Sequence, residues 1–236
     1  MPGAILRVGQ LIGGVTAGAF DGARMVGFVF GLTGVRDREL VHWSDMLAVR
    51  ASYRGRGIGQ RLKEYQRDKV RALGVRAMLW TYDPLAAPNA RFNLCRLGAR
   101  PIDYVVDMYG ANTGSALHGP LPTDRFIVRW ELDDGPRQAA VPDAAPLPLA
   151  NPLGGDGAPT VADIGQAPAV RVQIPTDLAE VRRQGDDMAL AWRLTIREVM
   201  TTLLARGYRV AGFDRGTTDR LPAYLLVRGE TAGVDA

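Results

Sequence analysis

Apolar positions near the start of the chain alternate in the way that strands require. Val15–Phe20 and Arg24–Phe30 read as two strands, and Asp21-Gly22 between them supplies the positive φ angles of a β-hairpin turn. His42–Val49 is predicted to be a third strand. Ile58–Leu73 instead repeats its apolar residues at helical spacing, which predicts an amphipathic helix. This part of the chain therefore predicts three strands followed by one helix.

The next elements predict that the sheet continues beyond this helix. They are a short buried strand, a second helix with Pro88 near its start, and two further strands: Ala77–Thr81, Asn89–Leu97, Ile102–Tyr109 and Phe126–Leu132. A strand–helix–strand unit followed by a helix and antiparallel strands indicates an α/β fold with a central mixed sheet. We expect residues 1–132 to form one domain.

The remainder of the chain changes character at Asp133. Residues 133–169 contain seven prolines and no aromatic residue, a composition that predicts an extended linker. Residues 170–236 then predict a C-terminal strand–helix–strand–strand segment around the amphipathic helix Met188–Arg206. Thr123-Asp124-Arg125 recurs as Thr218-Asp219-Arg220 after a similar order of elements, which suggests a partial repeat.

Positive charge is concentrated in one segment of the chain. The sequence has 236 residues, 47% of them hydrophobic and 23% charged, as in a soluble globular protein. Its net charge is only +4, yet Arg50–Arg76 holds nine basic residues and two acidic ones. Aromatic residues do not interleave with this charge and no zinc or RNA-binding signature is present, so we expect no nucleic-acid partner. A compact polyphosphate ligand fits one short basic segment better.

The small numbers of cysteines and histidines and the hydropathy of the chain argue against several other classes of protein. One cysteine, Cys95, permits no intramolecular disulfide, and with His42 and His118 as the two histidines we expect no metal site. The apolar start of the chain is interrupted by Arg7 and has no basic region before it, unlike a signal peptide. No run of 18 uninterrupted apolar residues predicts a membrane span. We therefore expect a cytoplasmic protein.

The stretch YRGRGIG, residues 53–59, lies between a predicted strand and a predicted helix. Helix N-termini bind phosphate because their first N–H groups lack partners, and glycines let an anion approach the backbone closely. The P-loop requires Gly-Lys-Ser/Thr, which Gly59-Gln60-Arg61 does not supply. The dinucleotide fingerprint requires a glycine where Gln60 stands. The remaining pattern is Arg-x-x-Gly-x-Gly, formed by Arg54, Gly57 and Gly59.

This pattern resembles the acyl-CoA-binding motif of the GNAT superfamily of N-acetyltransferases, here in LAVRASYRGRGIGQRLKEYQ. The resemblance implies a GNAT-like fold in which the strand before the loop pairs with pantetheine and the loop amides hold the CoA pyrophosphate. By position, Leu47, Ala48 and Val49 would meet pantetheine. The pyrophosphate would meet Arg54, Gly55, Arg56, Gly57, Ile58 and Gly59.

A second block, WTYDPLAAPNARFNLCRLGA, resembles the next strand and helix of that fold, and more narrowly an uncharacterised branch with paired asparagines, here Asn89 and Asn93. Asn89 is accordingly a cofactor-binding candidate.

Two features depart from the family pattern. Few residues precede the hairpin, so residues 170–236 of this chain or of a second copy are expected to replace the usual first elements. The tyrosine that often protonates the leaving thiolate is replaced by Leu94.

Acyl transfer to an amine needs a base, a donor to the oxyanion and a leaving thiolate. The base candidates are His42 and Asp45 on one strand, and strand alternation puts them on opposite faces unless a bulge intervenes. His42 titrates near neutral pH, whereas the resemblance favours an acid such as Asp45. Asp83 is a further candidate that would contact a cationic substrate, or it simply forms a turn. His118 and the Thr123-Asp124-Arg125 loop are candidates for the acceptor pocket.

These observations together predict an acyl-CoA-dependent N-acyltransferase, with acetyl-CoA as co-substrate and a small-molecule amine or amino-acid-like acceptor. One alternative is a CoA-binding sensor or regulatory module without transfer activity, which the absence of the tyrosine favours. Another is a basic helix that binds nucleic acid, whose binding to DNA would depend steeply on salt. Whether the chain forms a homodimer stays open.

Overall fold

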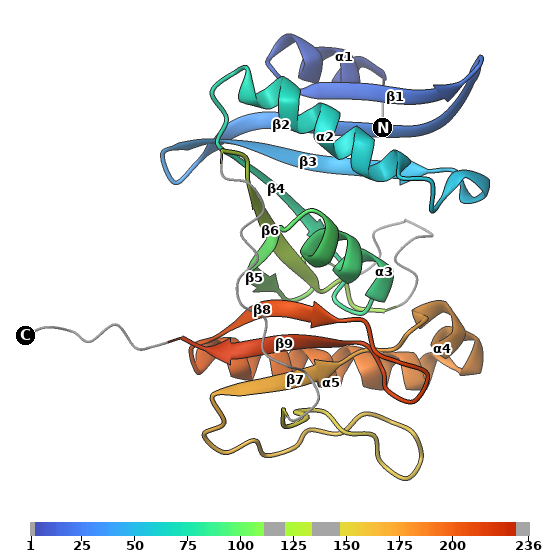
Figure 1. The fold of residues 1–236 in the computed structure, drawn as a ribbon, viewed down its shortest axis with the longest axis vertical. Helices are drawn as coiled ribbons and strands as arrows, with labels where there is room; N and C mark the ends of the chain where they lie inside the picture. Colours follow the sequence, from blue (N-terminus) through green and yellow to red (C-terminus); the bar gives the residue numbers. More distant parts are fainter. Residues whose placement is uncertain (1–2, 111–120, 134–146, 230–236) are drawn as a thin grey trace, which may run out of the picture. The chain divides into compact units, whose positions relative to one another are not determined.

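The structure is a computed structural model that describes residues 3–110, 121–133 and 147–229. It divides into two compact units (Figure 1). Unit 1 is Met1–Thr81 with Arg129–Pro136, and unit 2 is Tyr82–Val128 with Arg137–Ala236. Two strands, β4 (Ala77–Tyr82) and β6 (Arg125–Glu131), cross this division. The predicted division into residues 1–132, 133–169 and 170–236 therefore differs from the division into compact units.

Unit 1 is built on an antiparallel hairpin extended by one antiparallel and one parallel strand. Its elements are α1 (Gly3–Leu11), β1 (Val15–Asp21), β2 (Arg24–Arg36), β3 (Glu39–Val49), the 3-10 turn η1 (Ala51–Tyr53), α2 (Ile58–Arg71) and the start of β4. β1 pairs with β2 and β2 with β3, all antiparallel, whereas β4 runs parallel to β3. α2 connects the two parallel strands, as parallel pairing requires. The mixed sheet and the mixed α/β fold class are thus confirmed.

The two helices of unit 1 cover opposite faces of this sheet (Figure 1). Val29 of β2 is fully buried in a cluster with Ile58 and Leu62 of α2. On the other face, Gly9 of α1 lies so close to Phe30 that an added Cβ would stand 3.1 Å from its ring. α1 was not predicted, and it occupies the residues before the hairpin. It therefore supplies one of the elements that seemed to be missing from the start of the fold.

Unit 2 contains a second, three-stranded antiparallel sheet in the order β7-β9-β8. Its elements are α3 (Ala87–Ala90), the π-helical turn η2 (Arg91–Arg96), β5 (Arg100–Val105), the start of β6, β7 (Ala169–Gln173), α4 (Leu178–Gln184), α5 (Asp186–Ala205), β8 (Tyr208–Asp214) and β9 (Ala223–Arg228). The long helix α5 packs along one face of this sheet (Figure 1). The apolar stripe predicted on Met188–Arg206 is its core, and Trp192, Ile196 and Met200 are buried.

Three details of unit 2 differ from the sequence prediction. β5 ends at Val105 instead of Tyr109, and α4 was not predicted. Part of the predicted linker, residues 147–168, is also packed onto β7. Asn151 is fully buried, and its side chain both donates to and accepts from the backbone of Gln173 at 2.8 Å. A segment without aromatic residues is held here by buried hydrogen bonds, which composition alone does not reveal. Among the described residues, no helix is long and apolar enough to span a membrane.

We predict that Leu203→Ala destabilises unit 2 by about 2–5 kcal/mol, because this side chain is 2% exposed and its loss leaves a cavity. Leu194→Ala, on the same helix, is the matched control. Since Leu194 is 46% exposed, its truncation should cost less than about 1 kcal/mol. Urea unfolding followed by circular dichroism measures both values, and equal losses would contradict the described packing of α5.

Candidate active site

The parallel pairing between β3 and β4 is short. It covers Val41↔Ala77, His42↔Met78 and Trp43↔Leu79, and β3 continues for six more residues, to Val49, without a paired residue on β4. Backbone N–H and C=O groups on that edge of β3 are therefore not used by a parallel partner in this register. Such a strand end is a place where an extended ligand with amide groups can pair.

A β-bulge lies where the pairing with β4 ends. Phe30 pairs with Met46 but Leu32 pairs with Trp43, so Ser44 and Asp45 together oppose the single residue Gly31. The bulge shifts the alternation. Leu47 and Val49 share the α2 face with His42 and pack against Ile58 and Leu62. Simple alternation along β3 would put Met46 and Ala48 on the same face as His42, and this is wrong beyond Ser44.

Gly31 allows this bulge because it has no side chain. An added Cβ would lie 2.3 Å from Nε2 of His42 and 2.6 Å from the carbonyl oxygen of Trp43. On the bulged strand, the Ser44 hydroxyl donates to Oε1 of Gln66 in α2 at 2.7 Å, and both side chains are buried. Asp45, the other residue of the bulge, is exposed. The bulge thus directs Ser44 into the protein and leaves the Asp45 carboxylate accessible.

His42 is fully buried beneath α2. The Thr33 hydroxyl donates to the carbonyl oxygen of Gly13 (2.7 Å), so it accepts from His42, and its Oγ1 lies 3.0 Å from Nδ1. The proton of the neutral ring is therefore on Nδ1, and Nε2 is a buried acceptor without a partner in the part of the chain that the structure describes. Burial lowers the pKa of His42 to about 4, and the charge of Lys63 contributes to this decrease. This imidazole is neutral at pH 7 and does not reach the surface.

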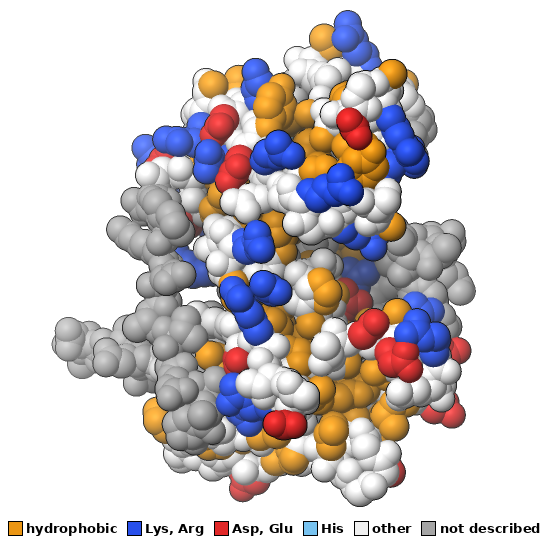
Figure 2. Space-filling model, turned by 45° about the vertical axis from the view of Figure 1, so that its right-hand side comes forward, with side chains coloured by type: hydrophobic (Ala, Val, Ile, Leu, Met, Phe, Trp, Pro, Cys, Tyr) orange, Lys and Arg blue, Asp and Glu red, His pale blue; other side chains and the backbone are white. Residues whose placement is uncertain are grey.

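The predicted phosphate loop follows β3 directly. Gly55 and Gly57 both have positive φ, 78° and 77°, where other residues are strained. Gly57 is the N-cap of α2 and offers no capping side chain, and the first intrahelical bond runs from the Arg61 N–H to its carbonyl oxygen (3.1 Å). The N–H groups of the first turn of α2 consequently have no helical acceptor. Arg54 and Arg56 are exposed beside them, and many Lys and Arg side chains lie on this unit in Figure 2.

The Gly-rich loop of residues 54–59 and the unpaired end of β3 thus form one continuous surface of unit 1. It combines free amides and positive charge at the start of α2 with the unpaired end of β3. The residues predicted to meet the donor all lie on this stretch: Leu47, Ala48, Val49 and the six loop residues from Arg54 to Gly59. A pocket of about 510 Å³ opens beside it between β1 and α2, and Ile58 and Arg61 are part of its lining.

Two candidates from the second sequence block lie in unit 2. Asp83 already has two arginine partners, Arg193 at 2.6 Å and Arg125 at 3.7 Å, and its Oδ1 accepts from the Leu85 N–H in the predicted turn. Because these arginines already occupy the Asp83 carboxylate, it is not free to bind the cationic group of a substrate. Asn89 is exposed in α3. His118 and residues 111–120 of the predicted acceptor loop lie outside the described residues, and within the described ranges no cluster of metal-binding side chains is present.

Residues 5–93 match the model of the acetyltransferase (GNAT) family. No curated protein matches the chain. Similar solved structures include the Arabidopsis thaliana Naa50 in complex with a bisubstrate analogue, with 20% identity, a TM-score of 0.40, and coverage of 48% of this chain and 70% of that one. Another is the Escherichia coli ribosomal-protein-S18-alanine N-acetyltransferase, with 17% identity, a TM-score of 0.43, and coverage of 58% and 81%.

The family match and the strand–loop–helix geometry agree. The match covers residues 5–93, which is less than half of the 236-residue chain. Within it, the Gly-rich loop of residues 54–59 lies at the junction between β3 and the start of α2, the strand–helix junction that the sequence predicted.

Burial of neutral His42 predicts a pH dependence of stability. Its pKa is about 4 in the folded protein and near 6.5 when unfolded, so only the unfolded chain gains the proton between these values. The free energy of unfolding should therefore fall as the pH is lowered from about 6.5 to 4, by at most about 3 kcal/mol from this residue. Urea titrations between pH 7 and 5 measure this slope. His42→Gln should flatten it, and an unchanged slope in this variant would contradict the buried neutral imidazole.

Proposed function

We propose that the chain is an acetyl-CoA-dependent N-acyltransferase that transfers the acyl group directly to a small amine or amino-acid-like acceptor. The observation that carries this proposal is the uncapped start of α2, with Gly55 and Gly57 at positive φ and Arg54 and Arg56 exposed beside it. Free amides, the helix dipole and guanidinium groups together favour a pyrophosphate.

Residues of β3 suit the remainder of such a donor. Leu47, Ala48 and Val49 lie on the part of β3 that has no paired residue on β4. Pantetheine is an extended chain with two amide groups, so it can pair with this strand edge as another strand would. The Arabidopsis thaliana Naa50 was solved with a CoA-containing bisubstrate analogue, and a Salmonella typhimurium relative with acetyl-CoA. Both relatives support an acyl-CoA as the donor.

The bulge suggests which groups of the chain act in the reaction. The thioester supplies the activated acyl group when acetyl-CoA is bound. Asp45 is exposed at the bulge and accepts the proton of the acceptor ammonium, directly or through water. A backbone N–H of β3 near Leu47 donates to the oxygen that becomes negatively charged. His42 is too deeply buried to meet an acceptor, so we assign it to the packing beneath α2.

A CoA-binding sensor without transfer activity is the second candidate. The observation that favours it is Leu94 in η2, where the family pattern often has the tyrosine that protonates the thiolate. A thiol-release assay with acetyl-CoA and a panel of amines separates the two functions. A transferase releases CoA thiol when the acceptor is present, whereas a sensor binds acetyl-CoA and releases none.

We predict that the wild-type protein binds acetyl-CoA with a Kd on the order of micromolar, and that Gly57→Glu weakens binding at least about tenfold. Glutamate adds a negative charge beside the pyrophosphate and is strained at φ 77°. Isothermal titration calorimetry measures both constants. Gly34→Glu is the control, because Gly34 is exposed, has no atom within 4 Å of an added Cβ and has no positive φ. No binding of acetyl-CoA to the folded wild-type protein would refute the proposal.

We predict that Asp45→Asn lowers kcat at least about 100-fold, because the amide cannot accept the ammonium proton. The affinity for acetyl-CoA should stay within about twofold of wild type, since Asp45 lies outside the phosphate loop. Steady-state kinetics on an acceptor found in the amine panel, together with calorimetry, measure the two effects. A variant with undiminished kcat would exclude Asp45 as the base.

A further inference from the structure

Helix α5 of unit 2 carries two arginines one turn apart that meet two carboxylates. Arg197 binds Asp124 through two hydrogen bonds, Nη2 to Oδ1 at 2.6 Å and Nε to Oδ2 at 3.0 Å. Arg193 donates through Nη2 to Oδ2 of Asp83 at 2.6 Å. The guanidinium group of a third arginine, Arg125, lies 3.7 Å from the same Oδ2. Both partners of Asp83 are buried, the side chains of Arg193 and Arg125 being 2% and 10% exposed.

The carboxylate of Asp124 makes no hydrogen bond with Arg125: its charge acts on Arg125, but Nη1 of Arg125 donates to the backbone oxygen of Asp124 at 2.7 Å. Besides Arg197, the Asp124 carboxylate accepts from the Tyr104 hydroxyl at 2.9 Å and from the Asp107 N–H at 3.0 Å. Burial opposes the ionisation of Asp124, but these hydrogen bonds outweigh it and lower its pKa. Asp107 is only partly buried, and its own carboxylate accepts from the N–H and the hydroxyl of Thr123.

Among the described residues, two buried guanidinium groups therefore share the one carboxylate of Asp83. The Tyr109 ring lies 5.4 Å from the guanidinium carbon of Arg125, but it adds no formal negative charge. Nε and Nη1 of Arg193 are buried and have no hydrogen-bond partner within the described ranges. Buried charges and buried donors are normally satisfied, because leaving them unpaired is costly. An anion would satisfy both the charge and the donors.

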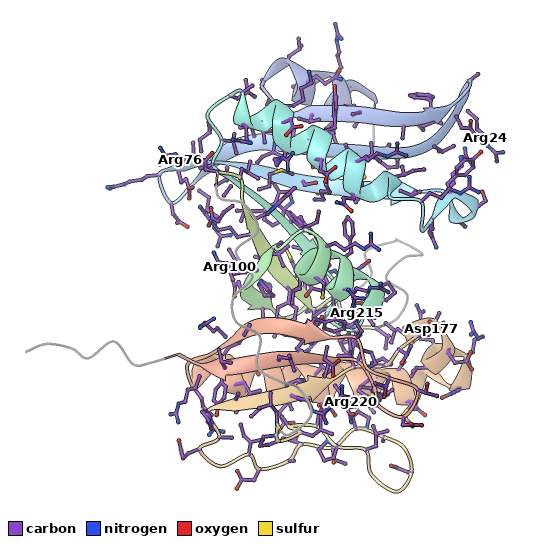
Figure 3. The ribbon with its side chains drawn as sticks, viewed as in Figure 1. Arg24, Arg76, Arg100, Asp177, Arg215 and Arg220 are labelled. Atoms are coloured by element: carbon purple, nitrogen blue, oxygen red, sulfur yellow. The ribbon has the colours of Figure 1, made fainter. Side chains whose placement is uncertain are left out.

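A second arginine of the same unit differs from Arg193 in its exposure. Arg220, labelled in Figure 3, binds Asp214 at 2.8 Å, and its side chain is 30% exposed, although its Nε is also buried without a partner among the described residues. The Arg193 side chain is only 2% exposed, and it shares its carboxylate with Arg125. Two guanidinium groups that share one carboxylate match one added negative charge, such as that of a carboxylate, better than a doubly charged phosphate.

We propose that Arg193 and Arg125 form a binding site for the carboxylate of a small molecule, entered beside Asp83, whose side chain is 24% exposed. Arg193 offers the donors and Arg125 adds charge. Asp83 holds the Arg193 guanidinium in place and does not itself bind the ligand. Where the transferase function proposed above holds, on which this further step rests, the acceptor is an amine that carries a carboxylate, such as an amino acid.

The test measures carboxylate binding without any acyl-CoA. Differential scanning fluorimetry screens amino acids and dicarboxylates at constant ionic strength, each against its amide, and calorimetry measures the Kd of those that raise the Tm. We expect at least one carboxylate to bind at least 10-fold more tightly than its amide. Arg193→Met should weaken this binding at least 10-fold, and Arg193→Lys, which keeps the charge but has fewer directed donors, should weaken it less.

Arg220→Met is the matched control, and its binding should stay within twofold of wild type. A panel in which no carboxylate is preferred over its amide would overturn the proposal, and so would unchanged binding in a folded Arg193→Met variant. If that variant does not fold, Arg193→Lys and Arg125→Lys test the proposal instead. The proposal is overturned if both of these variants keep the wild-type preference for the carboxylate over its amide. Failure of the acetyl-CoA titrations concerns the transferase function alone, since the carboxylate titrations contain no CoA.

Discussion

The candidate active site depends on one constraint, the bulge in β3 opposite Gly31. Because Gly31 has no Cβ, the carbonyl of Trp43 and the ring of His42 occupy the space where a side chain would stand. The hydrogen bond from Ser44 to Gln66 holds the bulged strand against α2. This extra residue turns Leu47 and Val49 toward α2 and leaves Asp45 outside. A regular strand would reverse these directions.

The bulge also ties the donor loop to the strand that precedes it. Leu47 and Val49 pack with Ile58 and Leu62, so the strand end and the first turn of α2 share one apolar cluster. Gly55 and Gly57 connect them through backbone conformations that other residues adopt only under strain. The position of the free amides relative to the β3 edge is thus fixed by packing. Such preorganisation favours binding, because little order remains to be imposed on the protein by the ligand.

The features predictable from sequence were those that depend on local pattern. The β1–β2 hairpin, the helix from Ile58 and the glycine loop before it follow from spacing and turn chemistry, and the structure confirms these elements. The predicted turn residues were wrong by one position, because Asp21 ends β1 and pairs with Arg24, so Gly22 and Ala23 form the turn. The bulge was not predictable in this way, because it arises from contacts of Gly31 and Ser44 with residues distant in sequence. Simple alternation therefore gave the wrong faces beyond Ser44.

In unit 2, the partners of buried polar and charged residues were likewise not predictable from the sequence. Composition suggested a linker over residues 133–169, yet Asn151 makes buried hydrogen bonds with Gln173 that only the folded chain reveals. Arg193 was not among the predicted site residues. Its helical spacing from the buried Ile196 and Met200, three and seven positions further on, was the available signal that it lies on the inner face of α5. Its pairing with Asp83, 110 residues away in sequence, depends on tertiary structure.

The central claim is that the end of β3 and the start of α2 hold the donor together. Hydrogen–deuterium exchange of the full chain, with and without CoA, tests it at the level of individual segments. The account predicts slower amide exchange on CoA binding in peptides that cover residues 47–61, with little change in β7 to β9. Binding of CoA without protection of residues 47–61 would contradict it.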